Sequence, residues 1–383
     1  LRDFYRRAKT GDTIILDSTR DQVILHPSAA TLKSYKNEAS SHANFRGRPG
    51  RNESGPVLTA DGVAVTLRAN IEVPSEFSGV ETYGASGVGL YRSEFLLARR
   101  GGFVSEDEQC VAYEAVARVA GKHGAVIRLF DLGGDNLREH FQESEKNPAL
   151  GLRAIRFVLS NEDVMRSQVR AIMRAAAAGT LKIVLPMVAD VSDVQRAKTI
   201  IEQESNNLRV ARRPFGEVSV GAMIEVPAAV LMADNIARIV DFFELGTNDL
   251  VQYTLAVDRG NDAVADWFRT LHPAVLRSID QSLQAAQRAS IPAIVCGEMA
   301  STPAYVVLLV GLGAIDLSMT PSAIPRVRRT IAGIDAGKAR TVARECLECD
   351  TADDVESLVR ERLVQFWPQL FDASSLPKPR LSK

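Results

Sequence analysis

Short apolar runs alternate with longer amphipathic stretches from about residue 63 onward. The runs are rich in β-branched residues, which is typical of strands that are buried on both faces. The intervening stretches carry apolar residues at helical spacings, as at Leu152, Ile155 and Leu159, and therefore predict helices. The eight expected strands are Val63–Ile71, Gly87–Arg92, Ala125–Asp131, Lys182–Val188, Val218–Glu225, Asp241–Gly246, Pro292–Cys296 and Ala314–Met319.

Eight β/α units over about 260 residues predict an α/β fold of the (β/α)8 TIM-barrel type, for which about 250 residues are typical. A doubly wound open sheet is the alternative, but it would not need eight such units. We expect the barrel to occupy residues 61–334. Residues 335–383 are expected to form a helical C-terminal extension that packs on its outside.

The N-terminal segment departs from this regular pattern. Apolar runs at 13–16 and 22–25 flank a polar stretch, which predicts a short strand pair. Two strands are not stable alone, so residues 1–30 are expected to be the edge of a larger domain. Residues 31–60 become rich in glycine and proline and are expected to be a linker. The first residue is leucine rather than methionine, and we expect a fragment or a processed product.

Composition narrows the class of protein. The chain has 383 residues, 46% of them hydrophobic, which excludes disorder as the dominant state. Its 46 Lys and Arg nearly balance 47 Asp and Glu, so no basic field favours nucleic acid or an anionic membrane. No apolar run is long enough to span a bilayer. Four cysteines are too few for a disulfide framework and fit a reducing compartment, so we expect a cytoplasmic protein.

Polar residues cluster where the predicted strands end, which is where barrels carry their chemistry. Glu225 and Asp249 lie one β/α repeat apart and are expected at equivalent positions on neighbouring strands, about 5 Å apart. Two such carboxylates repel each other unless a cation or a proton separates them. Mg²⁺ fits this pair, since it is commonly held by one or two carboxylates. A buried pair bridged by Arg or Lys is the alternative.

Three arginines are expected to converge on the same end of the barrel. Arg92, Arg128 and Arg259 each follow or end a predicted strand region. One arginine at a strand end is usually a solvated rim residue, but three beside a carboxylate pair indicate a small, densely anionic substrate.

The cysteines carry weaker signals. Cys296 ends a predicted strand, where it is either a small buried apolar residue or a nucleophile or proton donor. Cys346 and Cys349 form a CxxC without a second pair, which is not enough for a zinc site.

Taken together, these residues resemble the C-terminal region of enzyme I of the bacterial phosphoenolpyruvate-dependent sugar phosphotransferase system. The resemblance runs in order from about residue 10 to 332, and its 252–262 stretch is closer to enzyme I than to pyruvate phosphate dikinases or phosphoenolpyruvate synthases. The matching stretches are 87–95 (GVGLYRSEF), 131–135 (DLGGD), 147–156, 225–229 (EVPAA), 242–250 (FFELGTNDL), 252–262 (QYTLAVDRGND) and 296–298 (CGE).

The resemblance implies a phosphoenolpyruvate-binding barrel that forms a homodimer. Arg92, Arg128 and Arg259 would grip the phosphate and carboxylate, assisted by Asn248 and the backbone of Asp249. Glu225 and Asp249 would hold Mg²⁺. Cys296 would protonate the enolate carbon after the phosphoryl group has left, giving pyruvate.

The family's phosphoryl acceptor is a histidine on an N-terminal domain, and no histidine here has that context. Residues 1–30 resemble the last strands of that domain, so a partner phosphocarrier protein would be reached only through the part that is missing. The alternatives are a dikinase-like C-terminal domain, a carbon–carbon lyase, or a non-catalytic phosphoenolpyruvate sensor.

Several positions depart from the family pattern without removing a presumed ligand. Leu129 stands where threonine is usual, Asn136 replaces a common lysine, and Val251 replaces threonine. Glu244 lies beside the expected metal strand, where a small residue is usual. These differences bear on affinity or rate and not on the set of presumed ligands.

Overall fold

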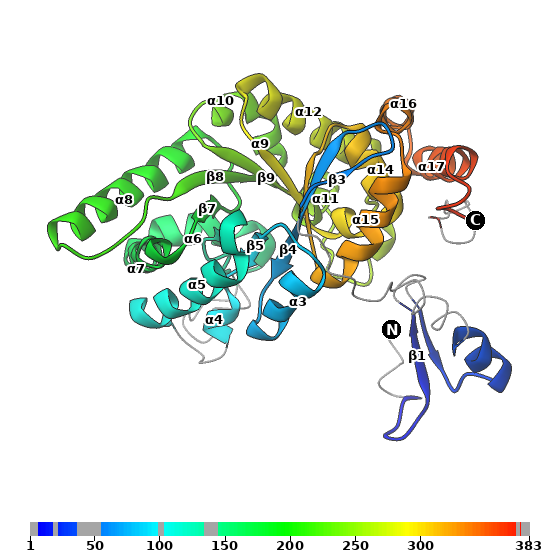
Figure 1. Cartoon of the computed structure of the whole chain (residues 1–383), viewed down its shortest axis with the longest axis horizontal. Coiled ribbons are helices and arrows are strands. Elements are labelled where there is room, and N and C mark those ends of the chain that lie inside the picture. The colour runs from blue at the N-terminus through cyan, green and yellow to red at the C-terminus, as the bar shows by residue number, and fades with distance from the viewer. Residues whose placement is uncertain are drawn as a thin grey trace.

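Eight parallel strands close into a barrel with helices around it (Figure 1). The structure is a computed structural model, and it describes residues 7–17, 22–36, 55–98, 103–133, 145–372 and 376. The last barrel strand pairs in parallel with the first, so the sheet has no open edge and the doubly wound alternative is excluded. The predicted (β/α)8 barrel is therefore confirmed.

All eight predicted strands are present, with ends that differ from the expected ones by a few residues. Their bounds are β4 (Ala64–Ile71), β5 (Val88–Arg92), β6 (Ala125–Arg128), β7 (Leu181–Leu185), β8 (Ser219–Ile224), β9 (Phe242–Gly246), β10 (Ala293–Cys296) and β11 (Asp316–Met319). A short strand, β3 (Val57–Leu58), precedes them and pairs antiparallel with β4.

The helices follow the strands in the order that the periodicity predicts. They are α3 (Phe77–Thr82), α4 (Phe95–Ala98), α5 (Glu106–Ala120), α6 (Ala154–Ser160), α7 (Glu162–Ala175), α8 (Val191–Val210), α9 (Pro227–Leu231), α10 (Ala233–Ala237), α11 (Thr247–Leu255), α12 (Pro273–Ala289), α13 (Glu298–Ser301), α14 (Pro303–Gly311), α15 (Ile324–Gly333), α16 (Ala336–Leu347) and α17 (Ala352–Phe366). None of the helices in the described residues is long and apolar enough to cross a membrane.

The barrel has two packed layers, because successive side chains on a strand point to opposite faces. The outer faces of the strands pack against the helices in one large apolar core. A second cluster fills the inside of the barrel: Leu90, Val126, Val184, Met223, Phe242, Ile294 and Cys296. Polar side chains also point inward, among them Arg68 of β4, whose Nε donates to both carboxylate oxygens of Asp316 on β11, at 2.8 and 2.9 Å.

The predicted C-terminal extension folds against the barrel helices. Val342 and Cys346 of α16 and Val359 of α17 are buried in the same large core. Asp61, next to the first barrel strand, accepts hydrogen bonds from the backbone amides of Ala336 and Gly337 at 2.8 and 3.1 Å, and so caps the start of α16.

The predicted N-terminal strand pair is present as β1 (Ile14–Asp17) and β2 (Gln22–Leu25), which pair antiparallel with Ile14 opposite Leu25. A helix follows at 29–36. The glycine- and proline-rich part of the expected linker, 46–51, lies outside the described residues, as does Asn136. The domain boundaries 1–30, 31–60, 61–334 and 335–383 stay predictions.

Candidate functional site

All seven predicted site residues line one cavity at the C-terminal end of the barrel. The cavity has a volume of about 90 Å³. Its walls include the side chains predicted from the sequence, namely Arg92, Arg128, Glu225, Asn248, Asp249, Arg259 and Cys296. Their convergence follows from the fold, since they come from strand ends, from the first turn of α11 or from the loop that follows this helix.

Glu225 follows the last residue of β8 and is buried. Its Oε1 accepts a hydrogen bond of 2.7 Å from the backbone amide of Met187. Met187 has a φ of +55°, an uncommon backbone conformation for a residue with a side chain. Burial raises the pKa of Glu225 to about 8, with further contributions from the negative charges of Asp249 and Asp131. The carboxyl therefore binds a proton at neutral pH unless a cation replaces it.

Asp249 does not occupy the strand position equivalent to Glu225, so that expectation was wrong. Ile224 is aligned with Leu245, which brings Glu225 level with Gly246. Asp249 lies three residues further on, in the first turn of α11. Gly246 leaves room for the Glu225 carboxylate, because a Cβ at position 246 would lie 2.6 Å from Oε2 of Glu225.

The two carboxylates fit a magnesium ion that shares its coordination with a substrate. Neither Glu225 nor Asp249 forms an ion pair with an arginine or lysine elsewhere in the described ranges, so the bridged-pair alternative is not supported. No group of three or more histidine, cysteine or carboxylate side chains is arranged to hold a metal among the residues that the structure describes. A two-carboxylate site would therefore need oxygens from substrate and water, which is how Mg²⁺ is usually held.

Two of the arginines are held by carboxylates at the rim and wall of the cavity. Arg92 forms an ion pair with Glu72, and both side chains are partly exposed. Arg128 is buried against Glu94 and Asp131, at 3.1 and 3.3 Å. Burial lowers the pKa of Arg128, but these two carboxylates outweigh that effect and raise it well above its ordinary value.

Arg128 keeps an unused donor. Its buried Nε has no hydrogen-bond partner in the described part of the chain. A buried N–H without a partner is costly, and an anionic ligand would satisfy it.

Arg259 lies in the loop that follows α11. The helix ends at Leu255, and the next residue, Ala256, adopts a left-handed φ of +53° and turns the chain. The backbone amide of Arg259 then donates a hydrogen bond of 3.0 Å to Oε1 of Gln252. This bond fixes the loop while leaving the guanidinium to face the cavity.

Cys296 is the last residue of β10, and Asn248 lies in the first turn of α11. Both line the cavity. The Cys296 thiol donates to the carbonyl of Leu245 at 3.3 Å, and burial raises its pKa well above the ordinary value. Oδ1 of Asn248 accepts from the backbone amide of Glu298 at 3.1 Å. Gly297 has a φ of +100°, and a Cβ there would lie 2.2 Å from Oγ1 of Thr247, so glycine is required.

Two further polar residues belong to this site and were not among the predicted ones. Asp131 lines the cavity. Arg153, at the start of α6, holds Asp131 with two hydrogen bonds of 3.0 and 2.8 Å, and its Nη1 donates to the hydroxyl of Tyr253 at 2.8 Å. Both residues stand in family-like stretches of the sequence, but nothing in those stretches showed that they meet.

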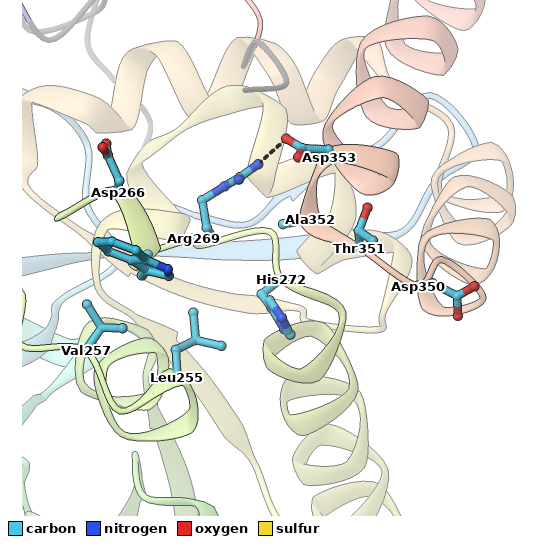
Figure 2. Close-up of a pocket in the computed structure, with 10 residues that line it drawn as sticks. Leu255, Val257, Asp266, Arg269, His272, Asp350, Thr351, Ala352 and Asp353 are labelled. Atoms are coloured by element: carbon cyan, nitrogen blue, oxygen red, sulfur yellow. Dashed lines mark hydrogen bonds and ion pairs between the residues drawn. The ribbon is translucent and has the colours of Figure 1, made fainter. Parts of the chain in front are cut away.

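A larger cavity of about 570 Å³ lies away from the predicted residues. It is bounded by the end of α11, the short 3-10 helix Ala265–Trp267, the start of α12 and the start of α17. Figure 2 shows Arg269 in its wall pointing to Asp353, with His272 and Leu255 below. The Arg269–Asp353 pair, 2.7 Å long, ties the C-terminal extension to the barrel.

The chain is similar to known proteins over most of its length. Residues 48–336 match the family model described as "PEP-utilising enzyme, PEP-binding domain". Proteins named phosphoenolpyruvate-protein phosphotransferase are 38% identical in Bacillus sp. (strain S), over 92% of this chain and 61% of theirs, and 38% identical in Listeria monocytogenes, over 91% and 62%. The protein of that name in Staphylococcus aureus is 36% identical over 92% and 62%. The chain therefore spans about three fifths of the length of these relatives.

Proposed function

Because the chain belongs to the family of PEP-utilising enzymes, whose PEP-binding domain it carries, we propose that it binds phosphoenolpyruvate at the C-terminal end of the barrel as the catalytic half of a phosphoenolpyruvate-protein phosphotransferase. The observation that supports this proposal most directly is that three arginines, three carboxylates and a thiol line one small cavity. Such a cavity suits a small molecule with two anionic groups and one carbon atom to be protonated.

The arginines would bind the two anionic groups of the substrate. Arginine presents a planar fork that matches both carboxylate and phosphate. Arg128 would offer its buried, unpartnered Nε. Arg92 would exchange its ion pair with Glu72 for one with the substrate. Asn248 and the backbone of Asp249 lie in the first turn of α11, where the helix dipole favours an anion.

Glu225 and Asp249 would hold Mg²⁺. Bound there, the ion would neutralise charge on the phosphoryl group, and positioning and charge neutralisation are the main requirements of phosphoryl transfer. The phosphoryl group would pass to a histidine on an N-terminal domain. Cys296 would then protonate the enolate carbon and yield pyruvate, since its raised pKa keeps the thiol protonated at neutral pH.

The experiment combines this chain with a separately purified acceptor-histidine domain of the family, phosphoenolpyruvate and Mg²⁺. Formation of phosphohistidine and pyruvate, both lost in Arg259→Ala, is the expected result. Cys296→Ala should still bind phosphoenolpyruvate but form pyruvate about 100-fold more slowly or worse. Arg288→Ala is the matched control, because Arg288 is an exposed arginine paired with Asp234 on the outer helices.

Other outcomes would point to the alternatives. Binding without transfer would favour a phosphoenolpyruvate sensor. Turnover of an acyl or aldol compound without any acceptor would favour a lyase. Absence of binding in calorimetry would overturn the assignment.

The assembly and surroundings of the enzyme are also part of the proposal. The barrel would form a homodimer, an N-terminal acceptor-histidine domain would pass the phosphoryl group to a phosphocarrier protein, and the enzyme would work in the cytoplasm. Sedimentation of the chain over a range of concentrations tests the homodimer, and a monomer at every concentration would contradict it.

A further inference from the structure

Glu244 lies inside the barrel, directly below Cys296. In the parallel pairing of β9 with β10, Ile294 is aligned with Glu244 and Cys296 with Gly246. Since side chains alternate along a strand, Glu244 points inward with Ile294 and Cys296. Gly246 contributes no side chain between Glu244 and the end of β9, and Oε2 of Glu225 would lie 2.6 Å from a Cβ at that position.

The Glu244 carboxyl is buried without a hydrogen-bond partner. The residue is 0% exposed, and neither Oε1 nor Oε2 has a partner in the described ranges. It interacts with the Cys296 thiol, although that contact falls short of hydrogen-bond geometry. Since the thiol hydrogen points to the carbonyl of Leu245, the sulfur is left to accept. A buried polar group without a partner is costly and calls for a functional explanation.

Burial raises the pKa of Glu244 to about 8, so at neutral pH the group is an acid with a proton to give. Few neighbouring charges oppose this state. The charged groups that act on the carboxyl from other strands are Arg128 of β6, Asp316 of β11 and Arg68 of β4. Arg128 is engaged by Glu94 and Asp131, and Arg68 is engaged by Asp316.

The other titratable groups near Glu244 inside the barrel interact with neighbours other than its carboxyl. Lys182 of β7 lies over the Phe242 ring at 5.2 Å. Glu225, which follows β8, and Arg92 of β5 act on the Cys296 thiol.

We propose that Glu244 is a proton donor to Cys296, and that it restores the thiol after Cys296 has protonated the enolate carbon. This inference rests on the proposed function, because it supplies the acid that the same site consumes.

The proton balance is simple. The S–H bond of Cys296 breaks as a C–H bond forms at the enolate carbon, which leaves a thiolate and pyruvate. The O–H bond of Glu244 then breaks as the S–H bond re-forms, which leaves a carboxylate. Glu244 must regain this proton from the solvent before the next turnover. Thiolate never accumulates beside the carboxylates of the site, where its charge would be unfavourable.

The test measures pyruvate formation against pH in the acceptor-domain assay, with wild type, Glu244→Gln and Glu244→Asp. Wild type should lose activity above a pH of about 8, as Glu244 loses its proton. Glu244→Gln should be about tenfold slower or worse, and its alkaline decline near that pH should be absent. Glu244→Asp should regain part of the rate together with an alkaline decline. Binding of phosphoenolpyruvate should be unchanged in all three proteins.

Each result decides the question. If wild type makes pyruvate and Glu244→Gln matches its rate and pH profile, the relay is overturned while the proposed function stands. If wild type binds phosphoenolpyruvate but makes no pyruvate, the proposed reaction fails and the relay with it. An infrared difference spectrum of wild type and Glu244→Asp at pH 7 provides a readout without turnover. It should contain the carbonyl band of a protonated carboxyl, and a carboxylate band alone would overturn the relay.

Discussion

The backbone amide of Met187 donates a 2.7 Å hydrogen bond to Oε1 of Glu225, across the ends of two neighbouring strands. Met187 adopts a left-handed φ of +55° to do so. Such conformations cost of order 1–3 kcal/mol and persist where the surrounding structure imposes them. One oxygen of Glu225 is thus fixed by the protein, and the other faces the bare position at Gly246.

This arrangement predicts that metal binding depends on pH. Because the pKa of Glu225 is raised to about 8, the metal-free carboxyl holds a proton at pH 7 that Mg²⁺ must displace. The affinity for Mg²⁺ should therefore rise about tenfold per pH unit from pH 6 to near 8, and then level off. Calorimetry in buffers of different ionisation enthalpy should detect about one released proton. No proton release at pH 7, or the same release from Glu225→Gln, would contradict the prediction.

The ion pair between Arg92 and Glu72 predicts a variant that binds substrate more tightly. Both side chains are partly exposed, so the pair is a weak interaction that phosphoenolpyruvate must replace. Glu72→Gln should free Arg92 and raise the affinity about two- to fivefold, which corresponds to less than about 1 kcal/mol. Titration calorimetry with phosphoenolpyruvate and Mg²⁺ measures this. Glu114→Gln is the control, because Glu114 pairs with Arg118 on α5. Weaker binding by Glu72→Gln would show that Glu72 positions Arg92.

The burial of Glu244 predicts how stability changes with pH. The folded pKa of about 8 lies above the ordinary value of 4.5, so the folded protein holds a proton that the unfolded chain has lost. Between these values Glu244 should lower the free energy of unfolding by about 1.4 kcal/mol per pH unit. Glu244→Gln should lose this contribution and keep only the fall due to Glu225, whose pKa is also raised to about 8, and denaturant unfolding at pH 5 and pH 8 measures the difference. Parallel pH dependence in the two proteins would contradict the prediction.

Glu204 provides the control for that experiment. It is equally buried, but its two oxygens pair with Arg166 and Arg170 at 2.7 and 2.9 Å. Burial raises the pKa of Glu204, but the hydrogen bonds from these arginines outweigh burial and lower it. Its contribution to stability should therefore be present above pH 4.5 and be lost only on acidification, so that Glu204→Gln keeps the fall between pH 5 and 8.

The ion pairs of Arg269 in the wall of the large cavity predict that this residue stabilises the attachment of the C-terminal extension. Arg269 pairs with both Asp353 and Glu356, and Glu356 is mostly buried. Arg269→Ala would remove the guanidinium that pairs with the mostly buried Glu356 carboxylate and should destabilise the protein by about 2–4 kcal/mol. Thermal unfolding measures the loss, and the double variant Arg269→Leu with Glu356→Leu should recover most of it. An unchanged melting temperature in Arg269→Ala would show that the pair contributes little.

Much of the barrel could be predicted because each strand is buried on both faces and therefore leaves a continuous apolar run. The strand ends were harder to predict, as β6 shows. The apolar run suggests a strand through Asp131, but regular pairing stops at Arg128. The amide of Phe130 bonds to the side chain of Gln168 and that of Asp131 to Glu94, at 3.0 and 2.7 Å, instead of to a strand. Such distant side-chain partners leave no local signal.

The candidate site, too, could be predicted from the sequence only in part. Strand ends predicted which residues would meet, and the cavity contains all seven of them. The position of Glu244 next to Cys296 could not be predicted from the sequence, because it depends on the register in which β9 pairs with β10. Asp249 was misplaced because the chain enters α11 directly after β9, so the residue is helical.

The seam between β4 and β11 has a consequence for synthesis of the chain on the ribosome. Arg68 and Asp316, which join across it, are 248 residues apart, so at about 5–20 residues per second the first strand waits roughly 12–50 s for its neighbour. Throughout that time the nascent sheet has unpaired edges that can pair with other chains. Delivery of β11 is therefore the step that joins the two ends of the sheet, and a stall of translation before it would leave their edges open to other chains.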